Sequence, residues 1–89
     1  MTVSDTRTLA TRDGIRALVA EALDVTEDEI EQSESFREDL GADSLILIEL
    51  QGRLERHFDI EIPNEQADLM VDLASTCEIV WSILPGAVA

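Results

Sequence analysis

The sequence of 89 residues contains one cysteine, one histidine and no lysine. A single cysteine excludes an internal disulfide framework and a metal site built from several cysteines. No uninterrupted apolar run approaches the roughly 20 residues that a membrane-spanning helix requires. The first residues also lack a basic segment followed by an apolar one, which is the pattern of a signal peptide. We therefore expect a soluble, cytoplasmic protein.

Positive charge is scarce as well, because six arginines face 20 acidic residues and the formal net charge is −14. Such a field repels nucleic acid and anionic membranes and attracts basic protein surfaces. The excess is uneven: residues 24–43 hold nine acids and one arginine, residues 59–78 hold six acids and no base, and residues 44–58 are balanced. We expect neither nucleic acid nor a membrane as a partner, and we expect protein partners to be chosen on the neutral segment.

A chain of this length forms one small domain with one core. We expect an all-α fold, a small four-helix bundle with three main helices, one short helix and a long first loop. The main helices are predicted over residues 9–23, over 44–58 and from Leu73 to a stop at Pro85-Gly86, and the short one from a cap at Asn64 through Met70. The domain is predicted over residues 9–84, between a flexible N-terminal tail (1–8) and a C-terminal tail (85–89), and is expected to be a monomer.

The three main helices each show one apolar face at helical spacing. The faces consist of Ile15, Leu18, Val19 and Ala22, of Leu47, Leu50, Leu54 and Phe58, and of Leu73, Cys77, Val80 and Leu84. On the middle helix, Leu45 and Ile46 are predicted to be exposed near the N-terminal end. In the long loop, a capping box from Thr26 to Glu29 predicts one short helical turn. Four apolar residues are expected to fix that loop to the core: Val25, Ile30, Phe36 and Leu40.

Ser44 follows Gly41-Ala42-Asp43 at the start of the middle helix, with Asp43 as the predicted N-cap. A serine nucleophile needs a base within hydrogen-bond reach. The only histidine, His57, lies thirteen residues further along the same helix, which is about 20 Å at the helical rise. The acidic residues also lack the spacing of an EF-hand calcium loop. No catalytic residue and no metal site are therefore predicted, and we interpret Ser44 as an attachment point.

The stretch from Ser35 to Leu45, SFREDLGADSL, resembles the signature of acyl carrier proteins, and the resemblance covers roughly residues 9–84. The match continues at Glu49, Leu50, Leu54, Glu55, Phe58 and Ile60-Glu61-Ile62-Pro63. The resemblance implies a four-helix bundle with a long first loop. It also implies that Ser44 carries phosphopantetheine, transferred from coenzyme A by a separate, magnesium-dependent phosphopantetheinyl transferase. The thiol of that arm would hold an acyl group as a thioester, so the protein would be a carrier and not an enzyme.

The resemblance further implies sites for partners and for the acyl chain. The partners would be the transferase and then an acyltransferase, a ketosynthase or other pathway enzymes. The docking face is expected at Leu45, Ile46, Glu49 and Arg56, with Asp39 and Asp43 contributing to recognition by the transferase. The acyl chain is expected to lie against Leu47, Leu50, Leu54 and Ile62, which otherwise form ordinary core.

The class of carrier and the pathway stay open at this point. Asp43-Ser44, where peptidyl carriers of nonribosomal peptide synthesis have His-Ser, favours an acyl carrier. Fatty-acid carriers have an acidic second helix that docks on basic enzyme patches, whereas the segment 44–58 is neutral and contains Arg53 and Arg56. It looks closer to discrete carriers of aromatic polyketide or other specialised pathways, including antibiotic biosynthesis. A function of another class, an acidic helical adaptor without a prosthetic group, is compatible with the composition alone.

Overall fold

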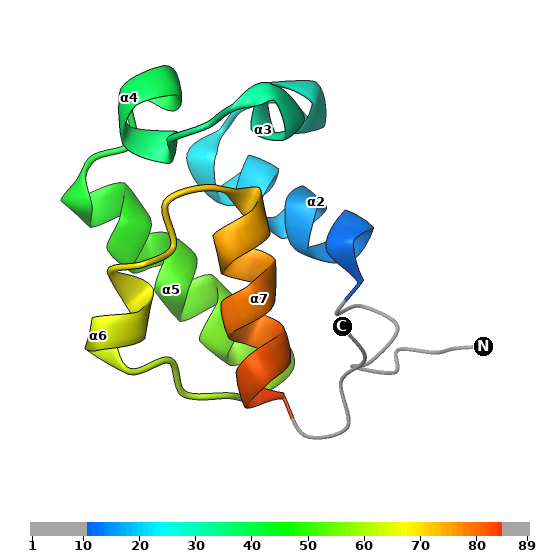
Figure 1. Ribbon diagram of the computed structural model, residues 1–89, viewed down its shortest axis with the longest axis vertical. Coiled ribbons are helices and arrows are strands. Elements are labelled where there is room, and N and C mark those ends of the chain that lie inside the picture. The colour runs from blue at the N-terminus through cyan, green and yellow to red at the C-terminus, as the bar shows by residue number, and fades with distance from the viewer. Residues whose placement is uncertain (1–10, 85–89) are drawn as a thin grey trace.

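Within residues 11–84, which the computed structural model describes, three long helices are joined by three short ones (Figure 1). The long helices are α2 (Arg12–Leu23), α5 (Ser44–Phe58) and α7 (Leu73–Ile83). The short helices are α3 (Glu27–Gln32), α4 (Phe36–Leu40) and α6 (Asn64–Ala67). This range contains no strand, so the predicted all-α bundle is confirmed.

Several predictions near the chain ends lie outside the described residues. They are the two tails (1–8 and 85–89), the first two residues of the helix predicted over 9–23, and the stop at Pro85-Gly86. Among the helices of residues 11–84, none combines the length and the apolar character that crossing a membrane requires.

Each long helix begins at a polar side chain that accepts a hydrogen bond from the backbone amide three residues later. The pairs are Thr11 with Gly14 at 3.0 Å, Asp43 with Ile46 at 3.0 Å and Asp72 with Ser75 at 2.9 Å. Such caps satisfy amides of the first turn that have no partner within the helix. The predicted bounds of α5, its cap and the start of α7 are therefore confirmed.

The long connection between α2 and α5 contains two short helices, whereas the sequence predicts one turn. The predicted capping box of α3 is present, with Thr26 and Glu29 each accepting the backbone amide of the other. Helix α4 is not predicted, because five residues are too few to show a helical period. Its ends nevertheless follow known rules: Ser35 Oγ accepts from the Glu38 amide at 3.2 Å, and Gly41 ends the helix at a φ of +69°.

Helix α6 differs from its prediction at both ends. Pro63 occupies the N-cap position with a φ of −58°, so Asn64 is the first helical residue rather than the cap. The Asn64 side chain instead accepts a 3.4 Å hydrogen bond from Gln51 on α5. The helix ends at Ala67, and Met70 lies beyond it with its side chain in the core.

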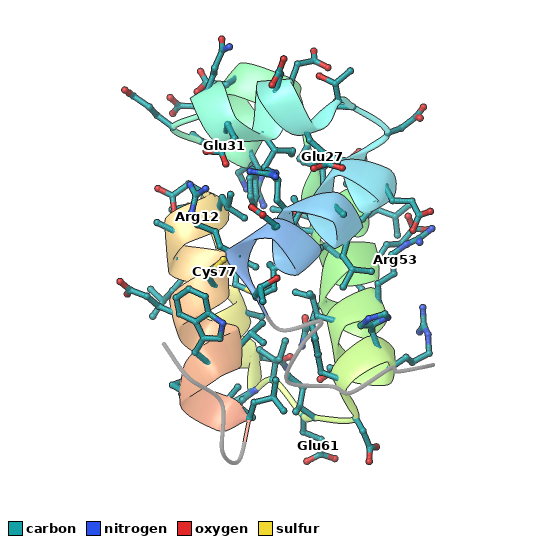
Figure 2. The ribbon with its side chains drawn as sticks, turned by 90° about the vertical axis from the view of Figure 1, so that its right-hand side faces the viewer. Arg12, Glu27, Glu31, Arg53, Glu61 and Cys77 are labelled. Carbon is teal, nitrogen blue, oxygen red and sulfur yellow. The ribbon has the colours of Figure 1, made fainter. Side chains whose placement is uncertain are left out.

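The apolar faces of α2, α5 and α7 meet in a single core, as their spacing predicts. The side chains with no exposed surface include Ile15, Val19, Ile30, Phe36, Leu50, Leu54 and Val80. Two expected anchors of the long loop are thus fully buried, and the other two, Val25 and Leu40, are partly buried against the same core. Cys77 lies on the side of α7 that faces α2 (Figure 2), and burial raises the pKa of its thiol to about 11. Cys77 is core, as predicted.

The exposed apolar residues of α5 are not the predicted pair. Leu45 is exposed, with 68% of its surface accessible, but Ile46 is partly buried and packs on the core. Ile48 is the second exposed residue, at 62%. The physical reason is the helical phase: Ile46 precedes the buried Leu50 by four residues and shares its face, whereas Ile48 follows Leu45 by three.

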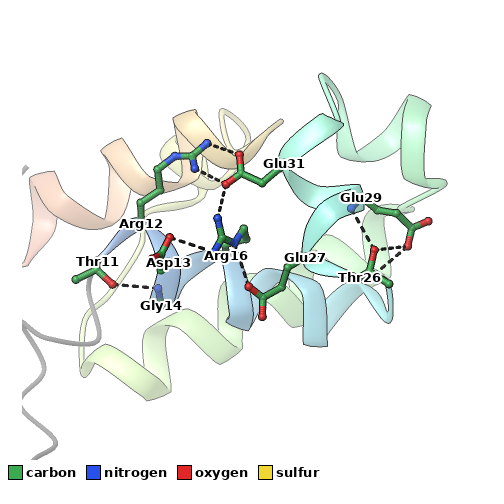
Figure 3. A network of polar contacts seen from close by, with 9 residues as sticks. All are labelled: Thr11, Arg12, Asp13, Gly14, Arg16, Thr26, Glu27, Glu29 and Glu31. Carbon is green, nitrogen blue, oxygen red and sulfur yellow. Dashed lines mark hydrogen bonds and ion pairs between the residues drawn. The ribbon is translucent and has the colours of Figure 1, made fainter.

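A network of ion pairs fixes α3 against the first turns of α2 (Figure 3). Arg12 and Arg16 both donate to the carboxylate of Glu31, with Arg12 Nη2 at 2.9 Å from Oε1. Arg16 Nε also lies 3.0 Å from Glu27 Oε1. The hydrogen bonds from Arg12 and then Arg16 lower the pKa of Glu31 to about 2. Part of the acidic loop is thereby neutralised and held in place ahead of Ser44.

Candidate functional site

Ser44 is the first residue of α5, and its side chain is exposed at the junction between α4 and α5. Only Gly41, Ala42 and Asp43 separate the two helices. Ala42 is 4% exposed, and its amide donates to the Phe36 carbonyl at 3.0 Å, which fixes the junction to the core. Ser44 is therefore exposed on a junction that is fixed to the core.

Arg37 on α4 points at Ser44, and its Nη2 donates to Ser44 Oγ over 2.9 Å. No role for Arg37 is predicted from the sequence. Two signals were available: Arg37 is the only base in residues 24–43, and it precedes Ser44 by seven residues. Neither signal predicts the contact, because it depends on α4 and the αL conformation of Gly41 turning the chain back toward α5.

A groove of about 300 Å³ opens beside these two residues. Helix α5 supplies one wall through Ser44, Leu47, Ile48 and Gln51, and the segment after α5 supplies the other through Ala67, Asp68, Met70 and Val71. Ser35, Phe36 and Arg37 line it from the α4 side. The amide of Phe36 donates to the Val71 carbonyl at 2.8 Å and joins two walls, while Gln51 Nε2 donates to the Ile62 carbonyl at 3.0 Å. Ser44, the predicted attachment point, therefore lies at the edge of an apolar groove.

The residues expected to lie along an acyl chain are divided between this groove and the core. Leu47 lines the groove. Leu50 and Leu54 have no exposed surface and Ile62 is 3% exposed, and none of the three lines the groove. Their alternative interpretation as core is confirmed, because they lie on the α5 face or connection that packs inward.

The residues expected to meet partners are exposed, with the exception of Ile46. Leu45, Glu49 and Arg56 are exposed on α5. Asp43 and Asp39 are also exposed, although both carboxylates bind backbone amides: Asp43 caps α5, and Asp39 accepts from Glu34 and Ser35 at 2.7 and 3.2 Å. The two acids thus shape the loop on either side of Gly41 besides carrying charge near Ser44.

Among the described residues, no carboxylate or imidazole forms a hydrogen bond with the Ser44 hydroxyl. Its hydrogen-bond partner is a guanidinium, which stays protonated in proteins. His57 is exposed near the other end of α5, where its ring packs edge-on against Phe58 with centroids 4.9 Å apart. In the described part of the chain, no group of three or more histidine, cysteine or acidic side chains is arranged to hold a metal ion. The geometry suits a modification made by another protein.

Comparison with known proteins agrees with this geometry. The family described as "Phosphopantetheine attachment site" matches residues 13–78, a range that includes Ser44 and both walls of the groove. The acyl carrier protein of Sulfurovum sp. (strain NBC37-1) is 39% identical over 75 residues, which cover 84% of this chain and 100% of that relative. The chain therefore belongs to the acyl carrier protein family, whose members are carriers and not catalysts, and its cofactor is phosphopantetheine.

Proposed function

We propose that Ser44 is the residue that carries phosphopantetheine, and that the chain delivers acyl groups to the enzymes of a biosynthetic pathway. The observation that carries this proposal is the exposed Ser44 at the start of α5, whose hydroxyl lies against the guanidinium of Arg37. When bound, the group supplies a thiol that holds an acyl chain as a thioester. The chain itself contributes position and no catalytic site of its own.

The residues around Ser44 are chemically complementary to phosphopantetheine. Its phosphate would be attached to an oxygen that already lies 2.9 Å from a guanidinium nitrogen. Beside it, Leu47, Ile48, Met70 and Val71 give the groove an apolar lining suited to methylene groups. The phosphate would therefore lie against Arg37, and the apolar chain would lie in the neighbouring groove.

The charges that α5 presents favour specialised biosynthesis, such as a polyketide or antibiotic pathway, over ordinary fatty-acid synthesis. Glu55 accepts from the Ile62 amide at 2.8 Å, and Arg53 lies 3.4 Å from Glu21 on α2. Glu49 and Arg56 make no ion pair among the described residues. The helix thus presents one free charge of each sign, whereas an acidic docking helix would present several carboxylates.

The docking face that follows from this arrangement consists of Leu45, Ile48, Glu49 and Arg56. Ile48 replaces Ile46 in the expected set because its side chain is the one exposed. Leu45 and Ile48 would supply apolar contact, and the two charges would fix the orientation of the partner. We place this exchange between carrier, transferase and pathway enzymes in the cytoplasm.

Attachment can be tested by mass spectrometry of the intact chain after incubation with coenzyme A, magnesium and a promiscuous phosphopantetheinyl transferase. The chain should gain the mass of one phosphopantetheine group, and Ser44→Ala should gain none. Ser82→Ala is the matched control, since Ser82 is an exposed serine on α7, and it should gain the same mass as the parent. An unmodified parent, or a gain that survives in Ser44→Ala, would contradict the proposal.

A further inference from the structure

We propose that Arg37 holds the phosphate of the group attached to Ser44 and thereby sets the direction in which the arm leaves the protein. This inference rests on the proposed attachment at Ser44. It concerns a residue outside the α5 docking face and assigns it a positioning role.

The first support is that Arg37 forms no ion pair with a carboxylate of the described residues. Three other arginines of the described residues, Arg12, Arg16 and Arg53, form ion pairs with acidic side chains. Arg37 forms none, although it stands in the most acidic segment of the chain and Asp68 lines the same groove. Its hydrogen bond goes to Ser44 instead.

Two acids close to Arg37 in the sequence, Asp39 and Asp43, bind backbone amides. Asp39 accepts two backbone amides in the turn before α4, and Asp43 caps α5. Because these carboxylates serve the backbone, the guanidinium of Arg37 remains free of them. Arg37 is thus a cation that lies against the hydroxyl to be esterified and forms no ion pair among the described residues. We expect such a guanidinium to bind the phosphate.

The chemistry of the two groups is complementary. A phosphodiester on Ser44 Oγ carries one negative charge on two free oxygens, which lie two bonds from the atom that Arg37 already contacts. A guanidinium offers several N–H donors in a planar fork and binds phosphate through two of them at once. One donor of Arg37 is accounted for by Ser44, and the other N–H groups of the same guanidinium would bind the free oxygens.

The same contact would offset repulsion at the junction. Esterification adds a negative charge next to Asp43 and near Glu38 and Asp39, in a chain with a net charge of −14. Arg37 is the base that α4 contributes to this junction. Since Arg37 and Ser44 both line the groove, a phosphate held between them fixes the root of the arm at the groove's edge.

The test is phosphorus-31 NMR of the modified chain, compared with its Arg37→Gln, Arg37→Lys and Arg53→Gln variants. The signal of the urea-unfolded modified chain gives the position of the free phosphodiester. The parent signal should be displaced from that position, Arg37→Gln should move it most of the way back and narrow it, and Arg37→Lys should retain part of the displacement. Arg53→Gln removes the same charge at a distant exposed site on α5 and should leave the parent signal unchanged.

Circular dichroism should be the same for all four chains, because Arg37 and Arg53 are exposed. A parent signal at the free position, or equal signals from the parent and Arg37→Gln, would overturn the role of Arg37 while leaving attachment at Ser44 intact. A parent that gains no phosphopantetheine in the mass assay would overturn both proposals.

Discussion

At the scale of single residues, position along one helix separates core from surface in α5. Leu54 has no exposed surface, whereas Leu45 on the same helix is 68% exposed. Both side chains are leucine, so the difference between them lies in burial and not in chemistry. Removing atoms from a packed site loses transfer free energy and leaves a cavity, while removing them from the surface loses little.

Leu54→Ala should therefore lower the free energy of unfolding by about 2–5 kcal/mol, a large share of the stability of a small domain. Leu45→Ala is the matched control and should change it by less than about 0.5 kcal/mol. Thermal and urea unfolding followed by circular dichroism measure both values. Equal melting curves for Leu54→Ala and the parent would show that the helical phase of α5 is wrong.

At the scale of elements, α2 and α3 are joined by charge as well as by apolar contact. Glu31 receives hydrogen bonds from two arginines of α2, and its pKa falls to about 2. A carboxyl whose pKa is lower in the folded than in the unfolded chain stabilises the fold when it is ionised. This contribution is present above the unfolded value of about 4.3 and disappears as the pH falls through the folded value.

Glu31→Gln should consequently be less stable than the parent at neutral pH, and the difference should shrink as the pH is lowered from about 5 toward 2. Glu61→Gln makes the same change of charge at the opposite end of the molecule (Figure 2), where Glu61 is exposed on the link before α6. Its stability difference from the parent should lack this pH dependence. Urea unfolding at a series of pH values gives both curves, and parallel curves would refute a role for the network.

At the scale of the whole molecule, the negative charge is spread unevenly over the sequence. The long loop and residues 59–78 carry the excess, while α5 is neutral. A net charge of −14 attracts basic surfaces over a distance, but short-range recognition depends on the charges at the contact. The choice of partner should thus depend more on the few unpaired charges of α5 than on the net charge of the protein.

Glu49→Lys should slow acyl transfer to or from a cognate enzyme, because it reverses the free negative charge of the docking face. Glu78→Lys is the control: it changes the net charge equally but lies on α7, and it should have the smaller effect. Circular dichroism should show the same helix content for both variants and the parent. If Glu49→Lys transfers at the parental rate, the docking face lies elsewhere.

Local signals in the sequence predict most of this fold. Asp43 and Asp72 mark the starts of α5 and α7, and the apolar spacing of the long helices identifies the core. The predictions from sequence are wrong where a residue's position depends on tertiary contacts, or where a small shift along the helix decides which face a side chain occupies. Ile46 and Ile48 differ by two positions, yet one packs inward and the other is exposed.

The candidate site is predicted less completely than the fold. The sequence identifies Ser44 and its capped helix, because both belong to one contiguous stretch. Arg37 is missed, since its contact with Ser44 requires α4 to form and Gly41 to reverse the chain. The groove is missed for a similar reason: Val71 and Met70 reach it from a segment after α6, and no periodicity in the sequence places them beside α5.

The hydrogen bond from the Phe36 amide to the Val71 carbonyl ties the loop before Ser44 to the segment after α6. An amide held in this way exchanges its hydrogen for solvent deuterium only when the bond opens. For this amide, opening means that α4 and the segment around Val71 separate at the edge of the groove. The deuterium uptake of Phe36 therefore reports how often that edge opens, and comparing unloaded with acyl-loaded chains would show whether cargo changes that frequency.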